Sequence, residues 1–203
     1  MMESQGARRI SFSLADAFRL GYDNIKRRFN RSVLIVGAIA LGIAFFSTLY
    51  LMDAFFKVYT QTEGGSLQVE SYQYWLVVVS FTVSIVSITN SMLIAVYERY
   101  REIGTMKCLG ALDQHILKLF LVESIILALI GGVSGFAVGL VGAIVACGFM
   151  IGFKFLLQVP ISVFLYLLFG AISLSLILST AATIYPAYRA AKLNPVEALR
   201  HEI

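Results

Sequence analysis

A short charged stretch decides how this chain folds: residues 98–111 read ERYREIGTMKCLGA. It carries both acidic and basic side chains, and it lies between two long runs of apolar residues. An apolar run of about 20 residues is long enough to cross a bilayer as a helix. We therefore expect a membrane-spanning helix on each side of residues 98–111, which we call the charged segment.

The composition of the whole chain supports a membrane protein. Of its 203 residues 59% are hydrophobic and 14% are charged, whereas soluble domains are about half apolar. The fold class predicted is an all-α integral membrane protein with four transmembrane helices, at residues 32–55, 72–96, 114–150 and 160–185. The third apolar run is long for one crossing and short for two. Residues 141–158 are therefore either an extension of the helix or a re-entrant hairpin.

The segments outside the spans are short. Residues 12–31 place apolar side chains on one face and charged ones on the other, which favours an N-terminal amphipathic helix at the membrane interface over a continuation of the first span. Residues 57–72 form a polar connection that is too short to fold as a domain. We expect Pro186 to end the fourth span, so that residues 186–203 form a tail.

The charged segment itself is predicted to be helical, within residues 97–112. Arg99, Arg101 and Glu102 are expected to be exposed. Gly110 suits a left-handed cap at the end of this helix, and Asp113 suits the N-cap of the next span. The helix is either a simple elbow or a docking surface for a soluble partner, and its two signs of charge favour docking.

The basic residues are distributed unevenly along the chain. All of the 16 Lys and Arg residues except Lys57 and Lys154 fall on one side of the predicted membrane. Because cytoplasmic segments carry the excess of basic residues, both termini and the charged segment are predicted to be cytoplasmic. This distribution explains the basic character of the chain, and no nucleic acid is expected as a partner.

Two spans carry small residues at helical spacing. In lipid, such stripes let helices approach closely and form hydroxyl hydrogen bonds. The partner is either another helix of this chain or a second protomer, and we expect at least one stripe to form a protomer interface. The stripe residues are Ser80, Ser84, Ser87 and Ser91 in the second span and Gly132, Gly135 and Gly139 in the third.

The residues of known enzyme motifs are missing from the sequence. It contains no G-x-x-x-x-G-K-[ST], H-E-x-x-H or G-x-S-x-G motif, so we expect no catalytic residues and no cofactor or metal bound by this chain. Glu123, near the cytoplasmic end of the third span, is either a structural acid or a proton relay. Only Glu123 and Asp53 offer acids for an intramembrane enzyme, which is the least favoured alternative.

The charged segment also resembles a family motif. Residues 97–111 are similar to the E-R-x-R-E-I-G-x-x-[RK]-A-x-G-A segment of the MacB/FtsX-like ABC transporter permeases (type VII ABC systems), with Cys108 in place of an alanine. Residues 119–124, LFLVES, resemble the family's F-L-x-E-x run. Residues 185–200, YPAYRAAKLNPVEALR, resemble its C-terminal signature P-A-x-R-A-A-x-x-x-P-x-E-A-L-R. The family usually inserts a large extracellular domain where this chain has residues 57–72, so the resemblance is to a minimal member.

The resemblance implies a permease of the cytoplasmic (inner) membrane, paired with a second, identical or paralogous protomer. Two copies of a cytoplasmic ABC ATPase would bind ATP and Mg, and the charged segment would be the coupling helix that contacts them. ATP hydrolysis would then drive export of an amphipathic or lipid-like substrate, or movement of an extracytoplasmic partner protein. The alternative is a membrane anchor that transmits force in an FtsX-like complex without transport.

The resemblance also assigns roles residue by residue. The ATPase-docking residues implied are Glu98, Arg101, Glu102, Ile103, Gly104, Met106, Lys107, Gly110 and Ala111. The residues of the tail that would support docking are Pro195, Ala198, Leu199 and Arg200.

Overall fold

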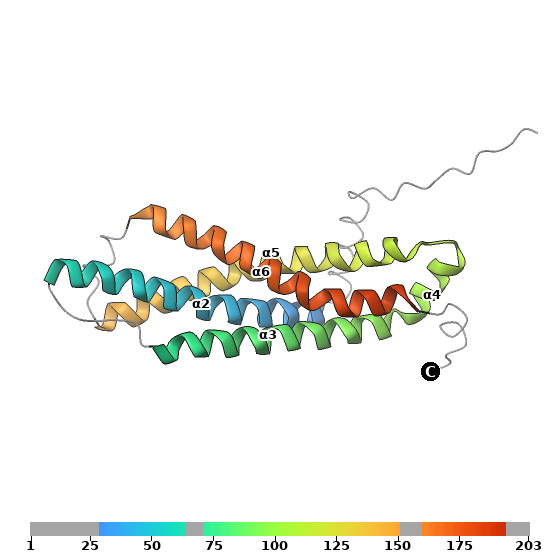
Figure 1. The fold of residues 1–203 in the computed structure, drawn as a ribbon, viewed down its shortest axis with the longest axis horizontal. Coiled ribbons are helices and arrows are strands. Elements are labelled where there is room, and N and C mark those ends of the chain that lie inside the picture. The colour runs from blue at the N-terminus through green and yellow to red at the C-terminus, as the bar shows by residue number, and fades with distance from the viewer. Residues whose placement is uncertain (1–28, 64–70, 151–159, 194–203) are drawn as a thin grey trace, which may run out of the picture.

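The computed structural model describes residues 29–63, 71–150 and 160–193, and within these ranges it contains helices and no strand. Each of the four long helices in the described ranges is long and apolar enough to cross a membrane, which confirms the predicted fold class. They run side by side in an elongated bundle, with the short helix α4 at one end (Figure 1). The helices are α2 (Phe29–Glu63), α3 (Ser71–Glu98), α4 (Tyr100–Cys108), α5 (Asp113–Met150) and α6 (Ile161–Ala191).

The first long helix extends further than predicted. Residues 57–63 were assigned to the polar connection, and this is wrong, because α2 continues to Glu63. The helix is supported by burial of Phe55 and Phe56 in an apolar cluster and by an ion pair, one helical turn apart, between Lys57 and Asp53 at 2.6 Å. Polar side chains do not end a helix by themselves, and the first helix-breaking residues come only at 64–65, Gly-Gly.

The third span is one continuous helix. Because α5 runs unbroken from Asp113 to Met150, residues 141–150 extend the helix and form no hairpin. Residues 151–158 lie outside the described residues. The predicted interfacial helix, apart from residues 29–31, which begin α2, also lies outside them, as does the tail with Pro195, Ala198, Leu199 and Arg200.

Pro186 does not end the last helix, contrary to the prediction. It lies inside α6, which continues to Ala191. A proline lacks the N–H that would bond the carbonyl four residues earlier, which here belongs to Ala182. The Oγ1 of Thr89, on α3, lies 3.2 Å from that carbonyl oxygen and 2.8 Å from the carbonyl oxygen of Ile85 on its own helix, so its single proton is shared between the two. A hydroxyl from a neighbouring helix thus replaces the missing backbone donor in part.

The glycine stripe of α5 brings α5 and α2 into backbone contact. A Cβ placed on Gly135 would lie 2.7 Å from the carbonyl oxygen of Ala40, and one on Gly139 would lie 2.6 Å from that of Ala44. Thr48 adds a hydrogen bond across the same interface, from its Oγ1 to the carbonyl of Gly139 at 3.0 Å. The small residues therefore serve close packing between helices of this chain.

The remaining stripe residues divide between packed and open positions. Gly132 faces α6, because a Cβ there would lie 2.5 Å from the Oγ of Ser175. Ser84 is buried, and its Oγ donates to the carbonyl of Ala38 on α2 at 2.9 Å. Ser80, Ser87 and Ser91 are partly exposed on α3.

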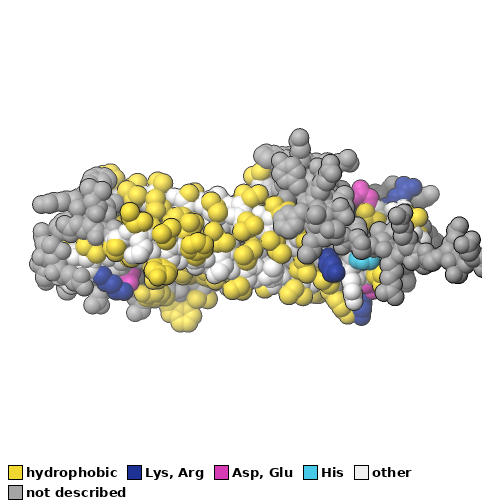
Figure 2. Space-filling model, turned by 90° about the horizontal axis from the view of Figure 1, so that it is seen from above, with side chains coloured by type: hydrophobic (Ala, Val, Ile, Leu, Met, Phe, Trp, Pro, Cys, Tyr) yellow, Lys and Arg dark blue, Asp and Glu magenta, His cyan; other side chains and the backbone are white. Residues whose placement is uncertain are grey.

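Apolar side chains cover the outer surface of the bundle. Figure 2 shows hydrophobic side chains over the middle of one face and charged side chains near its two ends. On α3, Trp75 is 72% exposed and Val83 62%, and α6 likewise exposes Tyr166 and Phe169. This distribution suits a bundle surrounded by lipid.

Candidate functional site

The candidate site is the charged end of the bundle. There α4 lies where α3 and α6 end and α5 begins (Figure 1). Apart from Asp53, Lys57 and Glu63 of α2, the charged residues of the described ranges lie at this end. The charged segment and the end of α6, which are far apart in the sequence, therefore form one surface.

The limits of α4 follow from its sequence. Gly110 has a φ of 92°, in the left-handed region that glycine adopts without a steric penalty. The N–H of Ala111 bonds the carbonyl of Met106 at 3.0 Å, and the N–H of Gly110 bonds that of Lys107 at 3.0 Å. These two bonds form a Schellman motif, so the predicted glycine cap is confirmed. Asp113 is the first residue of α5.

One face of α4 anchors it to the bundle. Ile103 is 4% exposed, and Gly104 is buried beside it. The side chain of Ile103 belongs to an apolar cluster that also includes residues of α3, α5 and α6. The other buried members of this cluster are Val96 of α3, Ile116 and Phe120 of α5, and Ala187 and Ala190 of α6.

The rest of the α4 surface is open. Arg101, Glu102 and Met106 are exposed, so three of the residues assigned to docking are accessible to a partner. Leu109 is 89% exposed and Leu112 is 62% exposed just beyond the helix. Neither leucine was predicted as a site residue. What marks them in the sequence is that two apolar residues lie on either side of the glycine cap at Gly110.

Lys107 faces neighbouring elements of the same chain. Its Nζ lies 2.8 Å from the Oδ1 of Asp113 on α5 and donates to the carbonyl oxygen of Leu193, after α6, at 3.1 Å. Its side chain is 13% exposed. Among the residues assigned to docking, Lys107 thus joins α4 to α5 and to the end of α6, while Glu98 bonds Arg31 of α2 at 3.0 Å.

Arg99 is buried, contrary to the prediction that it is exposed. Its side chain is 4% exposed, and its Nη2 lies 3.0 Å from the Oε1 of Glu123, whose side chain is 2% exposed. The guanidinium carbon also lies 5.8 Å from the ring centroid of Phe120. A carboxylate and an aromatic ring on α5 together draw this arginine inward, because each attracts a buried cation.

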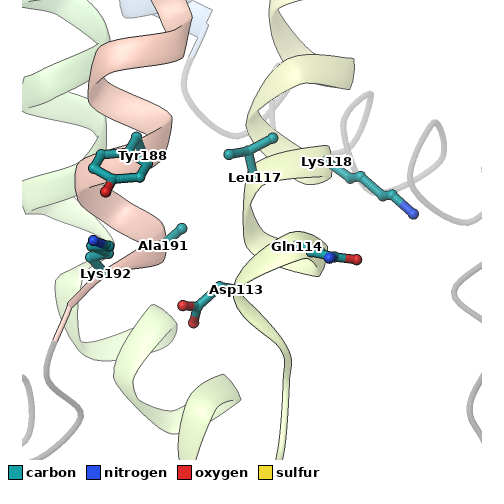
Figure 3. Close-up of a pocket in the computed structure, with 7 residues that line it drawn as sticks. All are labelled: Asp113, Gln114, Leu117, Lys118, Tyr188, Ala191 and Lys192. Atoms are coloured by element: carbon teal, nitrogen blue, oxygen red, sulfur yellow. The ribbon is translucent and has the colours of Figure 1, made fainter.

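A pocket of about 280 Å³ opens between α5 and α6 at the same end. Figure 3 shows Asp113 and Leu117 facing Tyr188 and Ala191 across it, while Lys118 points away. The Nζ of Lys192, which also lines the pocket, lies 4.8 Å from the ring centroid of Tyr188. Its hydrogen bond with Tyr188 raises the pKa of Lys192. The lining is mainly apolar, and the described residues hold no group of three acidic, histidine or cysteine side chains able to bind a metal ion.

Comparison with known proteins now identifies the family. Residues 74–195, which include α4 and its surroundings, match the model of the FtsX-like permease C-terminal domain. The chain belongs to this family of permeases. The match contains the charged segment, the glycine stripe and Pro186, so the features that build this end of the bundle lie within it.

Individual relatives agree with the FtsX-like assignment. The chain is 38% identical over 124 residues to the uncharacterized ABC transporter permease YknZ of Bacillus subtilis, covering 61% of this chain and 30% of the relative. It is 40% identical over 121 residues to the macrolide export ATP-binding/permease protein MacB of Nitrobacter winogradskyi, covering 60% of this chain and 18% of the relative. It is 36% identical over 126 residues to the uncharacterized ABC transporter permease MJ1507 of Methanocaldococcus jannaschii, covering 61% of this chain and 31% of the relative. The chain therefore spans less than a third of the length of these relatives.

The resemblance drawn from the motifs is thus confirmed at the level of the family. The chain is an FtsX/MacB-like ABC transporter permease with several membrane-spanning helices. By family it is a permease.

Proposed function

We propose that this chain is the permease part of an ABC transporter complex and that α4 is its coupling helix. The observation that carries the proposal is the two-sided character of α4. Its outer face exposes Arg101, Glu102 and Met106, while Ile103 on its inner face is buried among side chains of α3, α5 and α6. A partner that pushes on the outer face therefore acts on the whole bundle.

The partner proposed is a cytoplasmic ABC ATPase, in two copies that serve two permease protomers. Its contact surface needs acidic groups for Arg101, a basic group for Glu102 and an apolar recess for Leu109. The excess of basic residues at this end of the bundle supports a cytoplasmic location, and therefore cytoplasmic termini in the inner membrane. The partly exposed serines of α3 and its apolar outer face offer a surface for the second protomer.

ATP acts in this proposal by changing the contact at α4. A ligand shifts a conformational equilibrium only through its different affinity for the two states. ATP and Mg bound by the ATPase pair would favour a closed pair, and closure would displace the two α4 helices together with the bundles to which they are fixed. The movement would export an amphipathic or lipid-like substrate, which the relatives named for macrolide export support, or would move an extracytoplasmic partner.

The test is a charge reversal on the outer face of α4. The protein is purified in mild detergent from its native membranes with a tag, and we expect a protein with a phosphate-binding loop and ATPase activity to co-purify. Glu102→Lys should abolish co-purification and the associated ATP hydrolysis. Asp53→Lys, the same reversal at the far end of α2, is the matched control and should leave both unchanged. Normal binding and hydrolysis with Glu102→Lys would contradict the docking surface.

A transport assay then separates the two possible outputs. The purified complex is reconstituted in proteoliposomes that contain a fluorescent macrolide or a labelled phospholipid. ATP-dependent movement of either probe supports export. Full ATP hydrolysis without movement of a probe supports displacement of an extracytoplasmic partner.

A further inference from the structure

The junction between α3 and α4 consists of one residue, and this residue is a buried arginine. Arg99 separates Glu98, the last residue of α3, from Tyr100, the first of α4. Its Nη2 lies 3.0 Å from Oε1 and 3.2 Å from Oε2 of Glu123. Burial of two charged groups is costly even when they are paired, and a turn between two helices needs no charge. The buried pair therefore suggests a task beyond forming the turn.

A second arginine reaches the same carboxylate from another helix. The Nη2 of Arg31, on α2, lies 3.5 Å from the Oε1 of Glu123, and its Nη1 lies 3.0 Å from the Oε2 of Glu98. Glu123 on α5 is thus shared between α2 and the α3–α4 junction. Two guanidiniums and two carboxylates form a cluster without net charge, which we call the junction cluster.

The groups around Glu123 argue against a proton relay. The charged side chains that contact it in the described part of the chain are Arg31 and Arg99, and a guanidinium does not release its proton in a protein.

Nε and Nη1 of Arg99 are buried and have no hydrogen-bond partner among the described residues. Within the described residues Glu123 is thus the hydrogen-bond acceptor that holds the Arg99 side chain.

We propose that Glu123 is the positioning residue of α4. Through Arg99 and Arg31 it holds the α3–α4 junction against α5 and α2, so that a displacement of α4 is passed to those helices. This inference rests on the proposed function of α4 as the coupling helix. Two experiments separate them: one measures the position of α4 in this chain alone, and the other measures coupling in the complex.

The first experiment measures the position of α4 in this chain alone. Spin labels are attached to the native Cys108, which is exposed on α4, and to a cysteine introduced by Val138→Cys on the exposed face of α5. The buried Cys147 is replaced by alanine. Electron–electron double resonance should give a narrow distance distribution. With Glu123→Gln, which leaves two guanidiniums without their shared carboxylate, the distribution should broaden and shift.

Two further variants make this measurement decisive. Glu123→Asp keeps the charge on a shorter side chain and should broaden the distribution less, and it takes the place of Glu123→Gln if that variant does not fold. Asp53→Asn removes the carboxylate of the ion pair at the far end of α2 and should leave the distribution unchanged. Wild-type distributions for both Glu123 variants would overturn the proposal.

The second experiment measures coupling in the complex with the co-purified ATPase. The outer face of α4 is intact in Glu123→Gln, so we expect the ATPase to remain bound while stimulation of ATP hydrolysis by the fluorescent macrolide or the labelled phospholipid is lost. Unchanged stimulation in a variant whose distance distribution has broadened would overturn the transmission through Glu123. If no ATPase binds the wild-type protein, the proposed function fails, and the distance measurement still decides whether Glu123 positions α4.

Discussion

Substitution of Gly135 by alanine tests the backbone contact between α5 and α2. The added Cβ would lie 2.7 Å from the carbonyl oxygen of Ala40 and 2.9 Å from the Cβ of Ile43. Ordinary van der Waals contacts of a Cβ begin at 3.4 Å. A backbone carbonyl cannot rotate away like the end of a flexible side chain, so the two helices must separate along the interface.

The size of the effect follows from two opposing terms. Forcing an extra methyl group into a packed interface costs about 1–3 kcal/mol of stability. Alanine also favours the helix over glycine by about 1 kcal/mol. Gly170→Ala, on α6, is the matched control because a Cβ there meets no atom within 4 Å. The difference between the two variants isolates the steric cost, which we expect to be about 1–3 kcal/mol.

The assay is unfolding by sodium dodecyl sulfate in mixed micelles, followed by circular dichroism. Gly135→Ala should unfold at a lower fraction of dodecyl sulfate than Gly170→Ala, which should match or exceed the wild type. Equal midpoints for the two variants would refute the backbone contact between α5 and α2.

Three further experiments test the local structure. Thr89→Val removes the donor to the carbonyl that Pro186 leaves free and should cost about 1 kcal/mol of stability in the same unfolding assay. Pro186→Ala restores the backbone donor, so the cost of Thr89→Val should be smaller in that background. An equal cost in both backgrounds would contradict the role of Thr89 as the substitute donor. Gly110→Ala should cost about 1 kcal/mol because of the left-handed backbone, and unchanged stability would contradict the cap. In folded protein a maleimide should modify the exposed Cys108 and spare the buried Cys147, as mass spectrometry can show, and equal modification would contradict the burial of Cys147.

The features that the sequence predicted well depend on local rules. Apolar runs longer than a bilayer predict spanning helices wherever they occur, and the start of α5 at Asp113 agrees with the prediction to within one residue. The cap at Gly110 was predicted because only glycine adopts a positive φ without a penalty. These features need no knowledge of which helices are neighbours.

The features that the sequence predicted wrongly depend on distant partners. Pro186 ends a helix unless another helix supplies a donor, and Thr89 is far from it in the sequence. Arg99 resembles its exposed neighbour Arg101 until the fold brings Glu123 beside it. A single sequence does not show which residues far apart in the chain become neighbours in the fold.

The connection between α3 and α4 has a mechanical consequence. A single residue spans about 3.8 Å between neighbouring Cα atoms, so this joint contains no slack that could absorb a movement. The connection from α4 to α5 is longer, at residues 109–112, and contains the conformationally free Gly110. The backbone therefore couples α4 directly to α3, whereas α5 follows α4 through the side-chain contacts of Glu123 and Asp113. A push on α4 should tilt α3, whose outer face is apolar, before it moves the centre of the bundle.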